Sequence, residues 1–173
     1  MNVSILTTEG EYLKLCDVKA YLKVSGTDRD GFIVNCIDTA VGYVEKVINK
    51  SLLAHTVRYI TNADHSFVLP FFNIVSVESV VDYYTGNDVD YSLTADKSML
   101  NISRDMQVMI TYTTEPIDVD KFKVAVLALI SLLYDGITDA DQWNTVLYKY
   151  LYNYIPLWYG TTNRALLITT WTR

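Results

Sequence analysis

Two histidines and a neighbouring carboxylate come nearest, in this chain, to a catalytic or metal-binding set. His55 and His65 lie ten residues apart in strand-like sequence, and Asp64 directly precedes His65. Imidazole and carboxylate groups can share a metal ion or exchange a proton. No HExxH, CxxC or other ligand spacing accompanies them, so we interpret both histidines as surface or loop residues. An enzyme that uses these three side chains is kept as the third hypothesis for the function.

The other motifs of enzyme sites give no catalytic set. The chain has no G-x-S-x-G elbow, and its seven glycines form no phosphate-binding loop. Pairs of acids stand where we expect helices to begin, and a carboxylate at a helix start interacts favourably with the helix dipole. A cation site is the minority interpretation of these pairs. They are Asp118 with Asp120, Asp139 with Asp141, and Asp28 with Asp30. The sequence therefore predicts no catalytic residue, no metal and no cofactor.

Composition and charge restrict the class of protein further. Half of the 173 residues are apolar, which excludes a disordered chain. The formal net charge is −6, which disfavours wrapping of nucleic acid. Cys16 and Cys36 are expected to be small buried side chains in helices, with no disulfide between them. No signal peptide precedes the first expected helix, and the apolar run 124–134 is too short to span a membrane. We expect a soluble protein without a membrane partner.

Helices are expected on both sides of a β-rich middle. A short helix is expected at about 17–23 and a longer one at about 28–49, with Thr27 as its N-cap and Asp30 completing a capping box. An apolar stripe in i, i+4, i+7 spacing predicts one buried face: Ile33, Ile37, Ala40, Val41, Val44, Val47 and Ile48. Further helices are expected at about 118–135, apolar on nearly all sides, and at about 139–154.

The middle of the chain has the two-residue period of strands. β-branched and aromatic residues dominate from 52 to 114, and a turn signal stands at residues 85–88. We expect one antiparallel sheet there, while residues 2–8 are either a short strand or an arm. The fold class is therefore predicted to be α+β: mainly a helical bundle of about four helices with an antiparallel β insertion, followed by an extended C-terminal tail.

Aromatic and apolar residues near the C-terminus are the candidate contact residues. The tyrosines of the last helix stand at every second position, so they ring the helix, and some must face solvent or a partner. Residues 142–173 contain three basic side chains and no acid, an asymmetry typical of interaction tails. The predicted protein-interface residues are Trp143, Tyr148, Tyr150, Tyr154, Trp158, Tyr159, Arg164, Leu166, Leu167, Ile168 and Trp171.

In four stretches the sequence resembles the head-to-tail connector family of tailed bacteriophages, also called adaptor or head-completion proteins. The stretches are Asp17–Val24, the helix at Ile33–Leu53, the run from Phe67 through Val80, and Ala128–Asp135, which together span about 15–155. Two departures stand out. Asn73 occupies a position where similar sequences usually carry a second proline, and the final helix and tail match the family poorly.

The resemblance implies a non-enzymatic virion protein, made in the host bacterial cytoplasm and located at the neck of the particle. It implies a homo-oligomeric ring, of twelve copies, that docks on the portal protein after genome packaging and carries a tail or further neck protein. Genomic DNA would pass through the ring without sequence-specific binding, which a net negative charge suits.

Under this interpretation residues 1–155 form one connector domain and residues 156–173 form an extended tail that binds another subunit. The portal is the partner expected first, with a neighbouring copy or a tail component as alternatives. The strand-like, apolar run 166–171 either completes the chain's own sheet or adds to the sheet edge of another chain. A small-ligand or regulatory binding module of α+β type is the second hypothesis.

Overall fold

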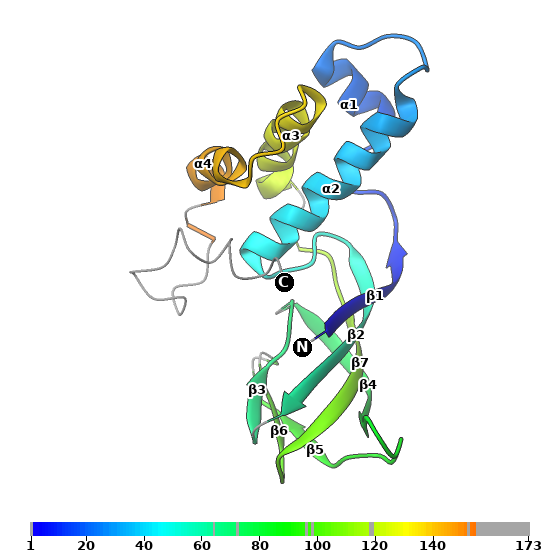
Figure 1. Cartoon of the computed structure of the whole chain (residues 1–173), viewed down its shortest axis with the longest axis vertical. Helices are drawn as coiled ribbons and strands as arrows, with labels where there is room; N and C mark the ends of the chain where they lie inside the picture. The colour runs from blue at the N-terminus through cyan, green and yellow to red at the C-terminus, as the bar shows by residue number, and fades with distance from the viewer. Residues whose placement is uncertain are drawn as a thin grey trace. The chain divides into compact units, whose positions relative to one another are not determined.

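The computed structural model describes residues 2–63, 65–71, 73–95, 97, 99–117, 120–151 and 153–154. The chain divides into two compact units (Figure 1). One, the β unit, comprises Met1–Glu11 and Lys50–Ile117. The other, the helical unit, comprises Tyr12–Asn49 and the chain from Asp118 onward.

A four-stranded antiparallel sheet forms the larger layer of the β unit. Its strands are β1 (Asn2–Glu9), β2 (Ala54–Ala63), β4 (Ile74–Asp82) and β7 (Met106–Thr114), in the order β1-β2-β7-β4. Along β2 every second side chain is buried, as the period of two in its sequence predicts. β1 and β4 are therefore the two edge strands, and β2 and β7 are the central ones.

A smaller antiparallel sheet supplies the second layer of the β unit. It contains β3 (Ser66–Val68), β5 (Tyr91–Leu93) and β6 (Met99–Ile102), in the order β3-β6-β5. Buried side chains from both sheets form one hydrophobic core, which includes Tyr112 of β7 and Leu100 of β6. The hydroxyl group of Tyr112 donates a hydrogen bond of 2.6 Å to the backbone oxygen of Pro70, so this buried polar group is satisfied.

A polar cluster joins the ends of β2, β4 and β7. The Asn73 side chain accepts a hydrogen bond from Ser51 N at 2.8 Å and donates to Ser51 O at 3.0 Å and to Glu115 O. The Thr114 hydroxyl donates to the Ser51 hydroxyl at 3.0 Å and accepts from His55 N at 3.2 Å. The Asn73 amide therefore makes three hydrogen bonds that a proline ring could not.

The described part of the helical unit contains four helices, which Figure 1 shows. They are α1 (Leu15–Leu22), α2 (Asp30–Ile48), α3 (Asp120–Tyr134) and α4 (Ala140–Leu151). α3 contacts both α2 and α4. The buried face of α2 contains six of the seven residues of its predicted stripe, and Val47 is only partly buried. The expectation of one buried face on this helix is confirmed.

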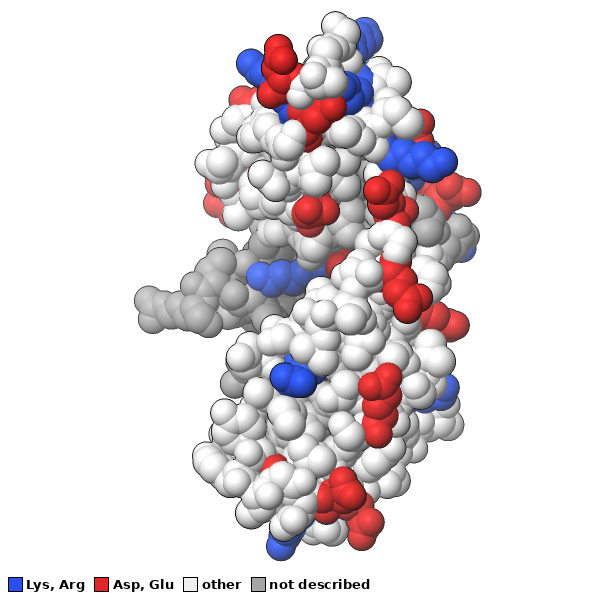
Figure 2. All heavy atoms as spheres, turned by 90° about the vertical axis from the view of Figure 1, so that its right-hand side faces the viewer, with Lys and Arg blue, Asp and Glu red and all other residues white. Residues whose placement is uncertain are grey.

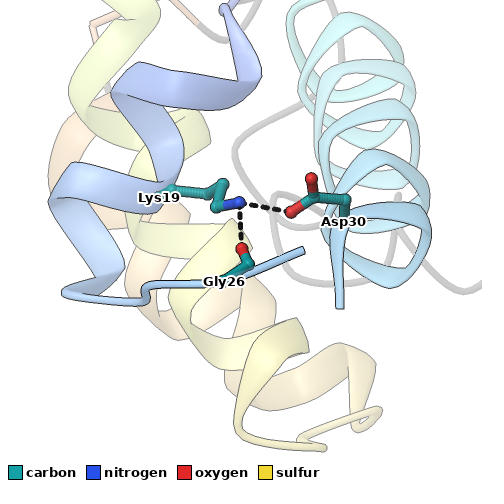
Figure 3. Close-up of polar contacts among 3 residues, drawn as sticks. All are labelled: Lys19, Gly26 and Asp30. Atoms are coloured by element: carbon teal, nitrogen blue, oxygen red, sulfur yellow. Dashed lines mark hydrogen bonds and ion pairs between the residues drawn. The ribbon is translucent and has the colours of Figure 1, made fainter. Parts of the chain in front are cut away.

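The start of α2 differs from the predicted capping arrangement. Arg29, rather than Thr27, is the N-cap, and its side chain makes no capping hydrogen bond. Figure 3 shows that the Asp30 carboxylate instead faces Lys19 of α1, with 2.5 Å between Oδ1 and Nζ, and that Lys19 also donates to Gly26 O. A carboxylate bound to an ammonium group on another helix is not available for capping. The capping prediction is wrong for that reason.

The predicted architecture, a mainly helical bundle with one β insertion, is also wrong. The fold is α+β, with an N-terminal strand and two helices, then two antiparallel sheets, then two more helices. The strands hold nearly as many residues as the helices, and β1 comes from the N-terminus to pair with β2. Sequence spacing shows where strands occur, but it does not show which strands share hydrogen bonds across long separations. The predicted tail at 156–173 lies outside the described residues.

Candidate interaction surface

The two histidines are not brought together into one site. His55 lies at the start of β2 and is buried, with its Nδ1 atom 3.1 Å from the hydroxyl oxygen of Thr8. His65 follows the end of β2 and is exposed, with Nε2 3.6 Å from Oδ1 of Asp105. Eight strand residues at about 3.3 Å each separate the two positions by roughly 25 Å. Surface placement is therefore right for His65 and wrong for His55, and Asp64 lies outside the described residues.

The remaining metal-ligating and nucleophilic side chains are also apart. Within the described part of the chain, no three His, Cys, Asp or Glu residues are grouped so that they could hold a metal ion. Cys36 is buried, as expected, and burial raises the pKa of its thiol. Cys16 is exposed, contrary to expectation, with its sulfur 3.8 Å from Oδ1 of Asp17. No described helix is long and apolar enough to cross a membrane.

Two tyrosines of α4 flank its exposed face. Leu147 and Leu151 are the buried residues of this helix. At about 100° per residue, Tyr148 and Tyr150 lie on opposite sides of that buried line, each roughly 80° from its centre, and Lys149 lies opposite it. Tyr148 is 46% exposed and Tyr150 is 44% exposed. The two rings therefore border one accessible helix face whose centre is a lysine.

Trp143 of α4 faces inward instead. The Trp143 ring packs edge-on against Tyr43 of α2, with 5.1 Å between ring centroids, and its indole N–H donates to Ile137 O at 2.8 Å. The Tyr43 hydroxyl donates a bond of 2.6 Å to Asn144 Oδ1, and burial raises the pKa of Tyr43 to about 12. Trp143 is thus a packing residue that fixes α4 to α2.

Tyr154 is intermediate between the exposed tyrosines of α4 and the packed Trp143. Its ring packs against the buried Phe122 of α3 at a centroid distance of 4.9 Å, yet 41% of the residue is exposed. The other predicted interface residues, from Trp158 to Trp171, lie outside the described residues. Tyr148 and Tyr150 are therefore the predicted residues that the structure places most openly on the surface.

The structure shows a second aromatic surface cluster that the sequence did not reveal. The Arg29 guanidinium lies 5.5 Å from the centroid of the Tyr134 ring and donates to its hydroxyl at 3.2 Å. Phe32 lies 6.0 Å from the same ring and is 47% exposed. Aromatic and arginine side chains contribute most to protein interfaces. Because Arg29 and Tyr134 are 105 residues apart, no local pattern could have found this cluster.

Charge on the visible surface gives no sign of a nucleic-acid groove. Figure 2 shows Asp and Glu side chains on this face of both units, with Lys and Arg at scattered positions and no continuous basic stripe. Proteins that bind a nucleic-acid backbone usually gather lysine and arginine along one surface. This face therefore lacks the usual features of a nucleic-acid interface.

Comparisons with known proteins find a likeness in fold alone. No protein-family model matches the sequence, and no curated protein matches it. A chain from the neck of an empty gene transfer agent (GTA) particle, computed with C6 symmetry, has a TM-score of 0.62 and 18% identity. That match covers 81% of this chain and 87% of the other.

Two further structures give the same result over nearly the whole chain. A chain from the virion of a native GTA particle has a TM-score of 0.59 and 18% identity, covering 99% of this chain and 95% of that one. A chain from the neck of a native GTA particle, computed with C12 symmetry, has a TM-score of 0.59 and 16% identity, covering 99% and 94%. The chain is thus structurally similar to proteins of such particles, at low identity.

Proposed function

We propose that this chain is a structural, non-enzymatic protein of the neck of a phage or phage-like particle, and that its copies form a closed ring there. The observation that carries the proposal is the shared fold. A chain of a GTA neck aligns with 81% of this one at a TM-score of 0.62. The resemblance of Asp17–Val24 and three further stretches to connector sequences supports it from the sequence.

Twelve copies are proposed for the ring, which docks on the portal protein and carries the next neck or tail component. Two of the similar structures are necks computed with sixfold and twelvefold symmetry, and this supports a ring. A ring requires heterologous contacts, in which one surface of a subunit meets a different surface of its neighbour. The tyrosine-flanked face of α4 and the Arg29–Phe32–Tyr134 cluster are two such surfaces.

The proposed ring surrounds the path of the DNA without binding its sequence. With 20 acids and 14 basic residues, the chain carries a net charge of −6, which repels the phosphate backbone. DNA passes more easily through a channel whose wall does not attract its phosphate groups. A ring of this chain is therefore suited to extend a DNA channel.

The ring surfaces can be tested by substitution in copies assembled with the portal. Replacing Tyr148 and Tyr150 together by serine, or Phe32 by serine, should lower the fraction of closed rings seen by negative-stain imaging. Tyr84→Ser is the matched control, since Tyr84 is 81% exposed but lies in the β unit. Equal ring yields for all three variants would reject both surfaces.

Residues 156–173 are proposed to bind another subunit of the assembly. Deleting residues 157–173 and measuring co-purification with the portal separates the possible partners. Loss of the portal from the purified complex supports a tail that holds the portal. Unchanged portal binding, with loss of rings, assigns the tail to a neighbouring copy. Unchanged portal binding with intact rings removes the tail from both contacts.

A further inference from the structure

The outer edge of β1 has no partner strand among the residues that the structure describes. Among the described residues the only strand hydrogen-bonded to β1 is β2, so the other side of β1 presents unpaired backbone groups. Ile5 is 46% exposed and Leu6 is 42% exposed on this strand. Exposed apolar edges are the usual sites at which another strand is added to a sheet.

The opposite edge of the same sheet is partly covered. On β4, Lys97 Nζ donates to the backbone oxygen of Val75 at 2.8 Å. Farther along, Val89 N donates to Val80 O at 2.9 Å. Natural sheets protect edges in this way, or with lysine, arginine or proline in the strand. β1 contains none of those three residue types, and its single charge is Glu9 at the end of the strand. Its one protective feature is a register shift between Ile5 and Thr7.

The chain itself contains a segment with the composition of a partner strand. Residues 164–171 read Arg-Ala-Leu-Leu-Ile-Thr-Thr-Trp, which is rich in β-branched and apolar residues and free of acids. The ten residues from 154 to 164 span up to about 35 Å when extended. This segment begins with Arg164, whose charge is opposite to that of Glu9 at the end of β1.

We propose that residues 164–171 of one copy add as an antiparallel strand to the free edge of β1 in a second copy. This inference rests on the proposed ring, because the tail and the β1 edge are different surfaces and so add a second heterologous contact to the one between the helical units. Backbone hydrogen bonds supply the pairing, and the Arg164–Glu9 contact selects its direction. Each copy then gives one strand and receives one.

Cross-linking of mixed single-cysteine chains tests the pairing. In full-length chains carrying Cys16→Ser, one copy receives Ser4→Cys and the other Thr169→Cys, which stand opposite each other when Arg164 faces Glu9. A short bifunctional maleimide should then join the two different chains. Adding Leu6→Lys, which places a charge in the new contact, should lower the yield about tenfold. Val75→Lys on the covered edge is the matched control and should leave it unchanged.

The outcomes separate this inference from the proposed function. A link that forms only within a chain carrying both cysteines overturns the inference, because the tail then occupies its own β1. Closed rings without a link between chains overturn it as well and leave the ring standing. Links between chains in the absence of closed rings support the strand pairing and reject the ring.

Discussion

Replacing Asn73 by alanine should destabilise the β unit by about 2–3 kcal/mol. The side chain accepts from Ser51 N at 2.8 Å and donates to Ser51 O at 3.0 Å and to Glu115 O. Ser51 is fully buried, so its N–H loses a partner that water does not replace, which costs about 1–3 kcal/mol. Ser51 O keeps the hydrogen bond from Ile117 N at 3.2 Å, so its loss is smaller.

Urea unfolding followed by circular dichroism measures this effect. With a slope of about 2 kcal/mol per molar urea, the midpoint of the unfolding transition should fall by about 1 M. Asn62→Ala is the matched control, since Asn62 is an exposed residue of β2 and the substitution should change stability by less than about 0.5 kcal/mol. If Asn73→Ala shifts the midpoint no more than Asn62→Ala does, the amide does not hold the strand ends together and the reasoning fails.

Three further predictions concern the helical unit. Lys19→Met should lower the free energy of unfolding of the helical unit by about 1 kcal/mol, because the ion pair between Lys19 and Asp30 is partly shielded from water. Thermal melts in low and high salt measure this loss. An unchanged melting temperature would contradict the prediction. Tyr43 has a pKa raised to about 12, so its contribution to stability is complete below about pH 10, the pKa range of an unfolded tyrosine, and is lost as the pH rises toward 12. Tyr43→Phe should therefore reduce the difference between unfolding free energies measured at about pH 9 and about pH 11, and an equal difference in both proteins would count against it. Replacing Tyr148 and Tyr150 by serine should change the melting temperature of the isolated protein by less than about 2 °C, because both side chains are nearly half exposed. The yield of closed oligomeric rings should fall in the same variant. A large drop in melting temperature would show that the two tyrosines are core residues.

Local periodicity predicted the elements whose pattern is complete within one segment. The stripe from Ile33 to Ile48 predicted the buried face of α2, because a period near four residues can arise only from one side of a helix. The β-branched and aromatic residues of 52–114 predicted strands, and in β2 every second side chain is buried. Both predictions depend on residues that are neighbours in the sequence.

Long-range contacts decided the features that the sequence did not reveal. The sequence left open whether residues 2–8 form a strand or an arm. In the structure they belong to β1, which pairs with β2 about fifty residues away. Asp30 matches a capping box in the sequence, but an ammonium group from another helix binds its carboxylate. The partners Arg29 and Tyr134 are separated by α2, the β unit and α3. Each of these outcomes is determined by packing between segments, which local residue types do not encode.

The candidate surface was predicted in part for the same reason. The spacing of the tyrosines correctly indicated that some of them face outward, as Tyr148 and Tyr150 do. It did not distinguish Trp143, whose ring packs against Tyr43 of a different helix. Whether an aromatic residue on a helix belongs to the core or to an interface depends on the segment that packs opposite it. The fold determines which segment that is.

The mass and symmetry of the protein bound to its portal test the central claim most directly. Purified complexes should be imaged by electron microscopy and their mass measured, with the portal alone as the reference. We predict a closed ring of twelve copies of this chain on the portal, coaxial with its channel. Single copies scattered on the portal, or an unclosed cluster without rotational symmetry, would contradict the account.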